Sequence, residues 1–430
     1  MDRRRIVLAF LYTFKTAGAY VIARATTDAL FLSRAGVEWL PLVFFISAIL
    51  LGAVSGFFAR FGVNAPLRRV ILLTLFVLAT STIGLCSLVE HYGESIWLFA
   101  AIYLLAELRG CLNSIQYGIM LNELFAASPS FHEANGRIGA AATFAGIGFG
   151  AFVGVQANSF GVIEMLYLAA GLELLAMIPV LLLRRTRSSE RSTQENSFKD
   201  ESRQLRGLKT GLRIAARSRR VRHIAYLVAF GVVVATLVEF QWKTSVADHF
   251  HSNENGIAGF LGWIHAGIGL VCALVQLCLT GPLLRRFRNT QLLSILPLSL
   301  FITSACVLIA TTKIVLFVAF VGVKSCDVFK RSVNIPVILS LYAEFPSGMR
   351  RRAITLVTGI VKPLSEAFGA SLILLLVSMG KPSALIYLTL ILICGWLHVA
   401  TRGKPRAPKP RPAVRDSPLN GLLKQSADRP

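Results

Sequence analysis

Charged residues are scarce in this chain: they make up 16% of its 430 residues, whereas soluble domains carry about a quarter. Hydrophobic residues make up 54% of the chain, and the mean hydropathy is +0.63. This composition excludes an ordinary soluble protein, which at this length would divide into two or three domains. We therefore expect the chain to lie in a membrane.

The sequence also lacks the motifs of common enzymes and metal sites. Its seven cysteines show no C-x-x-C spacing, and its seven histidines form no H-E-x-x-H pattern, so we predict no metal site. No G-x-x-x-x-G-K-[ST] loop occurs, so no ATPase motor is built in. We expect no enzyme and no cofactor. No cleavable signal is evident at the N-terminus.

Acidic residues are few, 22 against 45 basic ones, which gives a formal net charge of +23. The basic residues interrupt apolar stretches and form no continuous surface, so we expect no nucleic-acid partner. The expected partners are membrane lipids and a small anionic substrate, bound by a monomer.

Long apolar stretches fill most of the chain. A bilayer core of about 30 Å needs roughly 20 apolar helical residues, and twelve stretches meet this length. The predicted fold is an all-α membrane protein with twelve transmembrane helices in two six-helix bundles. The twelve spans are 6–32, 39–58, 70–89, 96–121, 138–156, 165–183, 223–249, 256–282, 289–311, 314–341, 353–379 and 382–401.

The basic residues between the spans predict an orientation. With the N-terminus inside, 34 of them lie in inner segments and only Arg34, Lys313 and Lys381 in outer loops. This asymmetry satisfies the positive-inside rule, so both termini are expected in the cytoplasm. We expect a multi-pass protein of a prokaryotic inner (plasma) membrane, with an organelle membrane as the alternative.

The charged segment in the middle predicts the domain organisation. We expect an N-terminal bundle at 1–183, a cytoplasmic linker at 184–222, a C-terminal bundle at 223–401 and a basic disordered tail at 402–430. Four residue pairs recur at an offset of 220, which indicates an internal duplication, as in rocking transporters. The pairs are Asp28 with Asp248, Gly36 with Gly256, Arg68 with Arg288, and Glu107 with Asp327.

Fifteen charged residues lie inside the predicted spans. At about 3 kcal/mol each they would be too costly in lipid, so we expect a polar cavity between the helices. In span 314–341, Lys324, Asp327, Arg331 and Asn334 share one helical face next to Lys330. In span 96–121, Arg109, Asn113 and Gln116 share another face, and Glu107 points elsewhere. Three pairs of opposite charge are predicted from i,i+4 spacing: Arg24 with Asp28, Glu239 with Lys243, and Lys362 with Glu366, the last as a structural pair.

Three short motifs resemble the nucleotide transporter family, the ATP/ADP translocases of plastids and intracellular bacteria and their bacterial relatives within the major facilitator group. L-V-E-F-Q-W-K (237–243) is similar to L-V-E-x-x-W-K, A-E-L-R-G (106–110) to A-E-L-W-G, and R-A-T-T-D (24–28) to R-D-T-K-D. The resemblance implies that Glu107 and Glu239 take part in transport. Thr27 and Arg109 stand where the family has lysine and often tryptophan.

These observations predict a secondary transporter that moves a polar, anionic metabolite by alternating access. Cations of the spans would attract the anion, and carboxylates would pair with them in the empty site or take up a proton. The alternatives are nucleotide antiport, export of a non-nucleotide solute, and a non-transporting receptor or scaffold. The predicted substrate-binding residues are Arg24, Asp28, Glu107, Arg109, Asn113, Glu239, Lys243, Asp327, Lys330 and Arg331.

Overall fold

The computed structural model describes residues 3–61, 66–93, 95–125, 131–183, 218–343, 345, 353–354 and 356–402, and all regular structure within these ranges is helical. The predicted tail and nearly all of the predicted linker lie outside these ranges. In the described part of the chain, eleven helices are long and apolar enough to cross a membrane. The prediction of an all-α membrane protein is confirmed.

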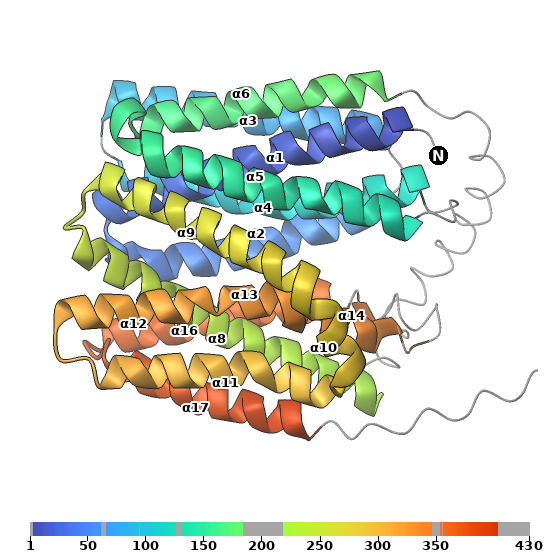
Figure 1. Ribbon diagram of the computed structural model, residues 1–430. Helices are drawn as coiled ribbons and strands as arrows, with labels where there is room; N and C mark the ends of the chain where they lie inside the picture. The colour runs from blue at the N-terminus through green and yellow to red at the C-terminus, as the bar shows by residue number, and fades with distance from the viewer. Residues whose placement is uncertain are drawn as a thin grey trace, which may run out of the picture.

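The helices form two bundles (Figure 1). The first bundle contains α1 (Arg3–Leu30), α2 (Leu40–Phe61), α3 (Leu67–Tyr92), α4 (Ile96–Phe125), α5 (Phe131–Phe160) and α6 (Val162–Leu182). The second contains α8 (Arg219–His249), α9 (Glu254–Val275), α10 (Gly281–Arg286), α11 (Asn289–Leu308), α12 (Lys313–Ser325), α13 (Asp327–Phe329), α14 (Ile335–Ala343), α16 (Lys362–Ser378) and α17 (Ala384–Thr401).

The predicted span 314–341 is the one that has no counterpart among the eleven membrane-crossing helices of the described residues. It consists of α12, α13, the π-helical turn η4 (Lys330–Asn334) and α14. The backbone stays helical through Cys326 and Phe329, so the segment continues without unfolding. Further π turns are η1 (Phe31–Ala35), η3 (Gln276–Thr280) and η5 (Val357–Val361), and η2 (Val37–Trp39) is a 3₁₀ turn. Single π turns within α-helices are frequent at functional sites.

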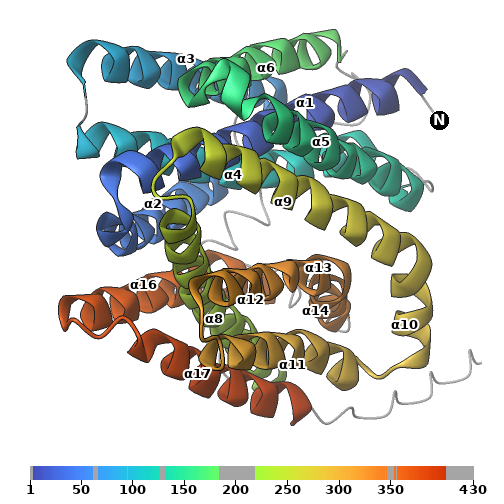
Figure 2. The same cartoon turned by 60° about the vertical axis from the view of Figure 1, so that its left-hand side comes forward.

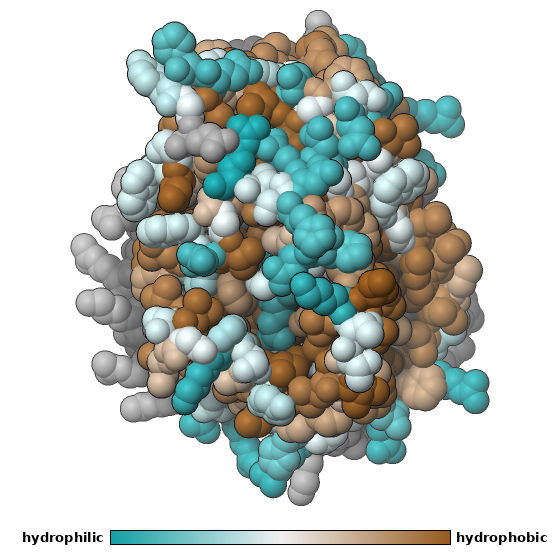
Figure 3. Space-filling view, turned by 90° about the vertical axis from the view of Figure 1, so that its left-hand side faces the viewer, coloured by the Kyte–Doolittle hydropathy of each residue, from teal (hydrophilic) through white to brown (hydrophobic). Residues whose placement is uncertain are grey.

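The two ends of the molecule differ. We call the end at which α1 begins and α17 ends the terminal face, and the opposite end the loop face (Figure 1). Glycines with positive φ end helices at the loop face, namely Gly36 (φ 86°), Gly93 (φ 75°) and Gly161 (φ 80°), because such a backbone strains other residues. Figure 3 looks onto the loop face and shows polar side chains across it, with apolar ones along its flanks.

The flanks expose large apolar side chains, among them Leu277 (82%), Trp97 (70%) and Ile391 (67%). Exposure on this scale exceeds what a soluble monomer shows. Lipid is the environment that these side chains suit.

The two halves repeat one another helix by helix. α3 begins at Leu67 and α11 at Asn289, and α6 begins at Val162 and α17 at Ala384, so an offset of about 220 relates them. By the same offset α2 corresponds to α9, and α5 to α16. The contacts between halves follow this repeat, because α5 packs on α9 and α2 packs on α16.

The contact between α5 and α9 brings the two backbones together. Gly150 and Gly154 of α5 face Gly262 of α9, and a Cβ on Gly262 would lie 2.7 Å from the Gly150 carbonyl oxygen. Small residues four apart permit this approach in membrane helices. Toward the terminal face, α9 leaves α5 and continues into α10 beside α11 (Figure 2).

Lys15 shows how the interior of a bundle satisfies a freed backbone group. Pro179 lies inside α6 and has no N–H, so the carbonyl of Leu175, four residues earlier, loses its helical partner. The Lys15 ammonium donates a hydrogen bond to this carbonyl at 3.1 Å. The Lys15 side chain thus joins α1 to α6 at this carbonyl.

Candidate functional site

Five polar side chains from five helices lie at nearly the same depth. Counted from the loop-face ends of their helical segments, with η1 taken as part of the segment of α1, all five lie ten or eleven residues into the segment. At 1.5 Å per residue this is about 16 Å, half of a bilayer core of about 30 Å. The residues are Arg24 (α1), Glu107 (α4), Glu239 (α8), His265 (α9) and Lys324 (α12).

Arg24 stands at the centre of an ion network that joins the two halves. Its Nε lies 3.3 Å from Asp28 Oδ2, and its Nη2 lies 3.7 Å from Glu239 Oε1. Its Nη1 forms an ion pair with Glu107 Oε1. The guanidinium of Arg24 thus contacts carboxylates on α1, α4 and α8, because its planar group presents several N–H donors.

Lys243 makes the second link between the halves. Its Nζ donates hydrogen bonds to Asp28 Oδ1 at 2.8 Å and to the Tyr103 hydroxyl at 2.7 Å. It also lies 3.6 Å from Glu239 Oε1. The side chain is only 1% exposed, so its charge is stabilised by these partners.

Lys324 extends the network within the second half. Its Nζ lies 2.7 Å from Glu239 Oε2 and 3.1 Å from Asp327 Oδ2. We call the connected set the central ion network. Its members are three cations and four carboxylates, so one negative charge is in excess: Arg24, Lys243 and Lys324 with Asp28, Glu107, Glu239 and Asp327.

Two further cations, Lys330 and Arg331, follow Asp327 on the turn η4, and we call them the cation pair. Both are exposed, and neither forms an ion pair within 4 Å among the described residues. Arg331 interacts electrostatically with Asp327 and with His265 of α9, and Lys330 interacts with Asp327. The cation pair therefore adjoins the central ion network.

The structure brings together eight of the ten predicted site residues. Six belong to the central ion network and two form the cation pair: Arg24, Asp28, Glu107, Glu239, Lys243 and Asp327, with Lys330 and Arg331. Two of the three predicted i,i+4 pairs form, at 3.3 Å in α1 and 3.6 Å in α8, whereas the described residues Lys362 and Glu366 form no ion pair within 4 Å of each other.

Arg109 and Asn113 do not join the central ion network. Arg109 is buried inside the first bundle, where its Nη2 donates to Glu173 Oε2 at 3.1 Å and to Thr82 Oγ1 at 2.7 Å. The Asn113 amide donates to the backbone carbonyl of Thr16. As the sequence predicts, Glu107 lies on another side of α4 than Arg109: Glu107 faces Arg24, whereas Arg109 packs inside the first bundle against Glu173.

Three residues near the network are absent from the predicted site. Lys324 was assigned to the polar face of its span and is a full member of the network. Tyr103, whose hydroxyl accepts from Lys243, lies four residues before Glu107 on α4. His265 of α9 interacts electrostatically with Lys324, Arg331, Asp28 and Arg24; one histidine in an apolar span carries no pattern that could have revealed it.

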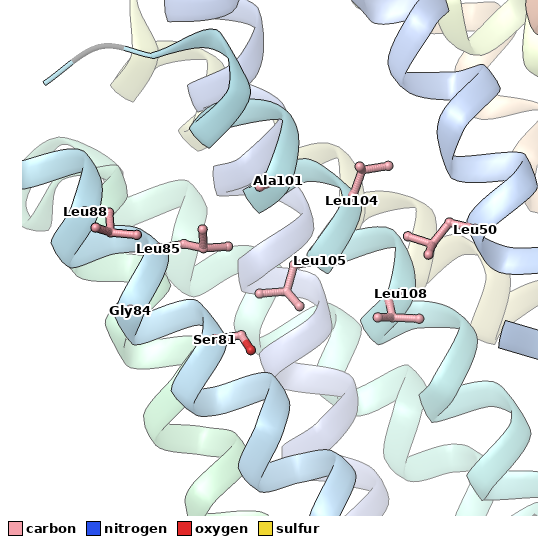
Figure 4. Close-up of a pocket in the computed structure, with 9 residues that line it drawn as sticks. All are labelled: Leu50, Ser81, Gly84, Leu85, Leu88, Ala101, Leu104, Leu105 and Leu108. Carbon is pink, nitrogen blue, oxygen red and sulfur yellow. The ribbon is translucent and has the colours of Figure 1, made fainter. Parts of the chain in front are cut away.

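Two cavities lie away from the network. A groove of about 540 Å³ between α2, α3 and α4 is lined almost entirely by apolar residues, such as Leu50, Leu85 and Leu105 (Figure 4), and suits acyl chains. A polar cavity of about 430 Å³ at the loop face contains Arg34 and Glu254. These two residues form an ion pair at 2.7 Å between the halves.

The chain resembles known transporters in sequence pattern and in fold. Residues 6–370 match the sequence model of the Major Facilitator Superfamily. No curated protein sequence matches the chain.

Solved transporter structures share the fold at low sequence identity. A nucleoside transporter has a TM-score of 0.64 at 12% identity, over 92% of this chain and 99% of its own. A D-xylose-proton symporter has 0.63 at 12%, over 93% and 99%. A POT family transporter in complex with 5-aminolevulinic acid has 0.62 at 12%, over 92% and 94%. At such identities the similarity extends to the fold alone.

Proposed function

The chain belongs to the Major Facilitator Superfamily, and from this premise we propose that it carries a polar metabolite with an anionic group. It is a secondary transporter of the alternating-access type, and not an enzyme. We propose that its substrate binds at the central ion network and the cation pair. This location agrees with the midplane sites between repeated bundles in such folds.

The cation pair is the observation that supports an anionic group. Lys330 and Arg331 are exposed, lie within the predicted span 314–341 and interact electrostatically with Asp327 of the central ion network. A cation in a narrow site of low dielectric attracts an anion far more strongly than one in water. The central ion network and the cation pair together contain five cations and four carboxylates.

Alternating access follows from the ion pairs that cross between halves. Near the loop face, Arg34 and Glu254 join the halves, and deeper in the protein Lys243 joins Asp28. These contacts close the loop side, whereas α9 leaves α5 toward the terminal face (Figure 2). When the halves rock to open the loop side, the crossing pairs have to break, and a substrate can replace the lost partners.

The positive-inside rule gives this conformation a direction. We propose that the terminal face is cytoplasmic in a cell inner membrane, so that the crossing ion pairs near the loop face lie toward the outside. The bundles of residues 1–183 and 223–401 would be the two rocking bodies, and the monomer would be the transporting unit.

A binding screen followed by transport tests the function. The purified protein is heated with single candidate solutes, including succinate, phosphate, ATP and an uncharged sugar, because a ligand of the folded state raises its melting temperature. Solutes that raise it are then assayed for uptake into proteoliposomes. We expect charged hits only, and transport of an uncharged sugar alone would refute the proposal.

Variants connect the transport to the site. Lys243→Gln should abolish uptake while the protein still inserts and melts cooperatively, because Asp28 loses its partner across the halves. Lys381→Gln removes a cation from an exposed turn and serves as the matched control with normal uptake. Equal uptake by both variants would remove Lys243 from the mechanism.

Nucleotide exchange is the second candidate. The three motifs that resemble nucleotide transporters contribute Arg24, Asp28, Glu107, Glu239 and Lys243, and all five meet in the central ion network. Counterflow of labelled ATP against ADP in proteoliposomes tests it. Lack of counterflow, with transport of a smaller anion, would leave the first candidate alone.

A further inference from the structure

The central ion network and the cation pair carry opposite net charges. The network has four carboxylates and three cations, which leaves one negative charge in excess. Lys330 and Arg331 add two positive charges at its terminal side. An anion alone would be attracted by one end of this site and repelled by the other.

The groups that an entering substrate meets at the acidic end are carboxylates. The side chains of Glu107, Glu239 and Asp327 are 20%, 25% and 25% exposed. Their partner cations are less exposed, with Lys243 at 1%, Arg24 at 12% and Lys324 at 15%. These three carboxylates are therefore more accessible than the cations with which they pair.

Two of these carboxylates keep an oxygen available. Glu107 contacts Arg24 through Oε1, and Asp327 contacts Lys324 through Oδ2. Within the described part of the chain, their second oxygens, Glu107 Oε2 and Asp327 Oδ1, form no ion pair. An ammonium group can donate to these oxygens without displacing an existing partner.

We propose that the substrate is a zwitterion, with its ammonium group at Glu107 and Asp327 and its anionic group at Lys330 and Arg331. The inference rests on the proposed function and specifies the substrate class of the same site. Asp327 and Arg331 are four helical residues apart, about 6 Å along the axis. An amino acid with its charges separated by three or four methylene groups fits this spacing.

Three probes with the same four-carbon chain test the charge requirement. They are 4-aminobutanoate, butanoate and butylamine, titrated into the purified full-length protein while its melting temperature is followed. We expect 4-aminobutanoate to bind about tenfold more tightly than either probe with one charge, because only it contacts both ends of the site. Equal affinity for butanoate would refute the zwitterion and leave the anion transporter intact.

Charge-neutral variants test the assignment of the two ends. Asp327→Asn and Glu107→Gln should each lower the preference of the protein for 4-aminobutanoate over butanoate. Arg331→Gln should lower its preference for 4-aminobutanoate over butylamine. Asp248→Asn, at the exposed loop-face end of α8, is the acidic control and should keep both preferences. If Asp327→Asn and Glu107→Gln both fold and retain the preference for 4-aminobutanoate, the assigned acidic end is wrong.

The outcome for the probes is separate from the outcome for transport. Binding of 4-aminobutanoate without uptake of any solute would contradict the proposed function and support the zwitterion site. Failure of all three probes to bind, with transport of another anion, would support the proposed function and contradict the zwitterion site.

Discussion

The close crossing of α5 and α9 predicts that alanine destabilises the protein at one glycine of α9 and stabilises it at another. At Gly262, an added Cβ would lie 2.7 Å from both the Gly150 carbonyl oxygen and the Gly154 nitrogen. Backbone atoms cannot rotate aside, so the helices have to separate. At Gly267, no atom lies within 4 Å of an added Cβ, so the new methyl group enters open space.

The magnitudes follow from these two environments. Overpacking costs about 1–3 kcal/mol, and replacing a helical glycine by alanine returns about 0.5–1 kcal/mol. Gly262→Ala should therefore destabilise the protein by about 1–2 kcal/mol, and Gly267→Ala should stabilise it by about 0.5–1 kcal/mol. A difference of about 2 kcal/mol corresponds to about 4 °C in melting temperature for a large domain.

The assay is thermal unfolding of both purified variants in one detergent, followed by tryptophan fluorescence. Gly262→Ala should melt below the unchanged protein and Gly267→Ala should melt at or above it. If Gly262→Ala melts as high as Gly267→Ala, the two backbones are not in contact and the halves are joined in another way. Because α5 and α9 belong to different halves, Gly262→Ala should also slow transport.

Three further predictions concern polar groups inside the bundles. Arg109→Met should lower the free energy of unfolding by about 3–5 kcal/mol, because Glu173 keeps a buried and unpaired charge. In a melting assay, the double variant with Glu173→Leu should recover much of this loss. Lys15→Met should lower the free energy of unfolding by about 1 kcal/mol in the same assay. In a protein that already carries Pro179→Ala, the same substitution should have almost no effect, because the introduced alanine supplies the N–H that the Leu175 carbonyl lacks. His265→Phe should raise KM for a transported substrate more than it changes kcat, and initial uptake rates measure this split; an unchanged KM would place the ring outside the site.

The membrane segments could be predicted from the sequence because one physical quantity decides them. Each span has to cover the same apolar thickness, so length and hydropathy locate it without knowledge of its neighbours. Span 314–341 shows the limit of this reasoning. The sequence has the length for a helix there, but the π turn at Lys330–Asn334 depends on local backbone geometry that no hydropathy pattern records.

The site likewise contains features that the sequence predicts and features that it does not. The i,i+4 pairs Arg24–Asp28 and Glu239–Lys243 could be predicted because helix geometry within one segment fixes them. The arc of α4 that faces the site could not be predicted. Periodicity gives the angle between Glu107 and Arg109 but not the direction in which the helix is rotated, and only the neighbours, Arg24 for one and Glu173 for the other, determine this rotation.

The repeat explains how a duplicated fold can hold an asymmetric substrate. Glu107 and Asp327 occupy equivalent positions at the offset of 220, and each forms an ion pair. Their cations are not equivalent, since Arg24 belongs to the first helix of one half and Lys324 to the fourth segment of the other. The carboxylates thus follow the symmetry of the repeat, and the cations depart from it. Lys330 and Arg331 depart from the repeat as well, since Gly110 and Cys111 stand at the equivalent positions. In the proposed site the cation pair alone distinguishes one end from the other, and a molecule with charges of opposite sign at its two ends is the kind of substrate that such a site can orient.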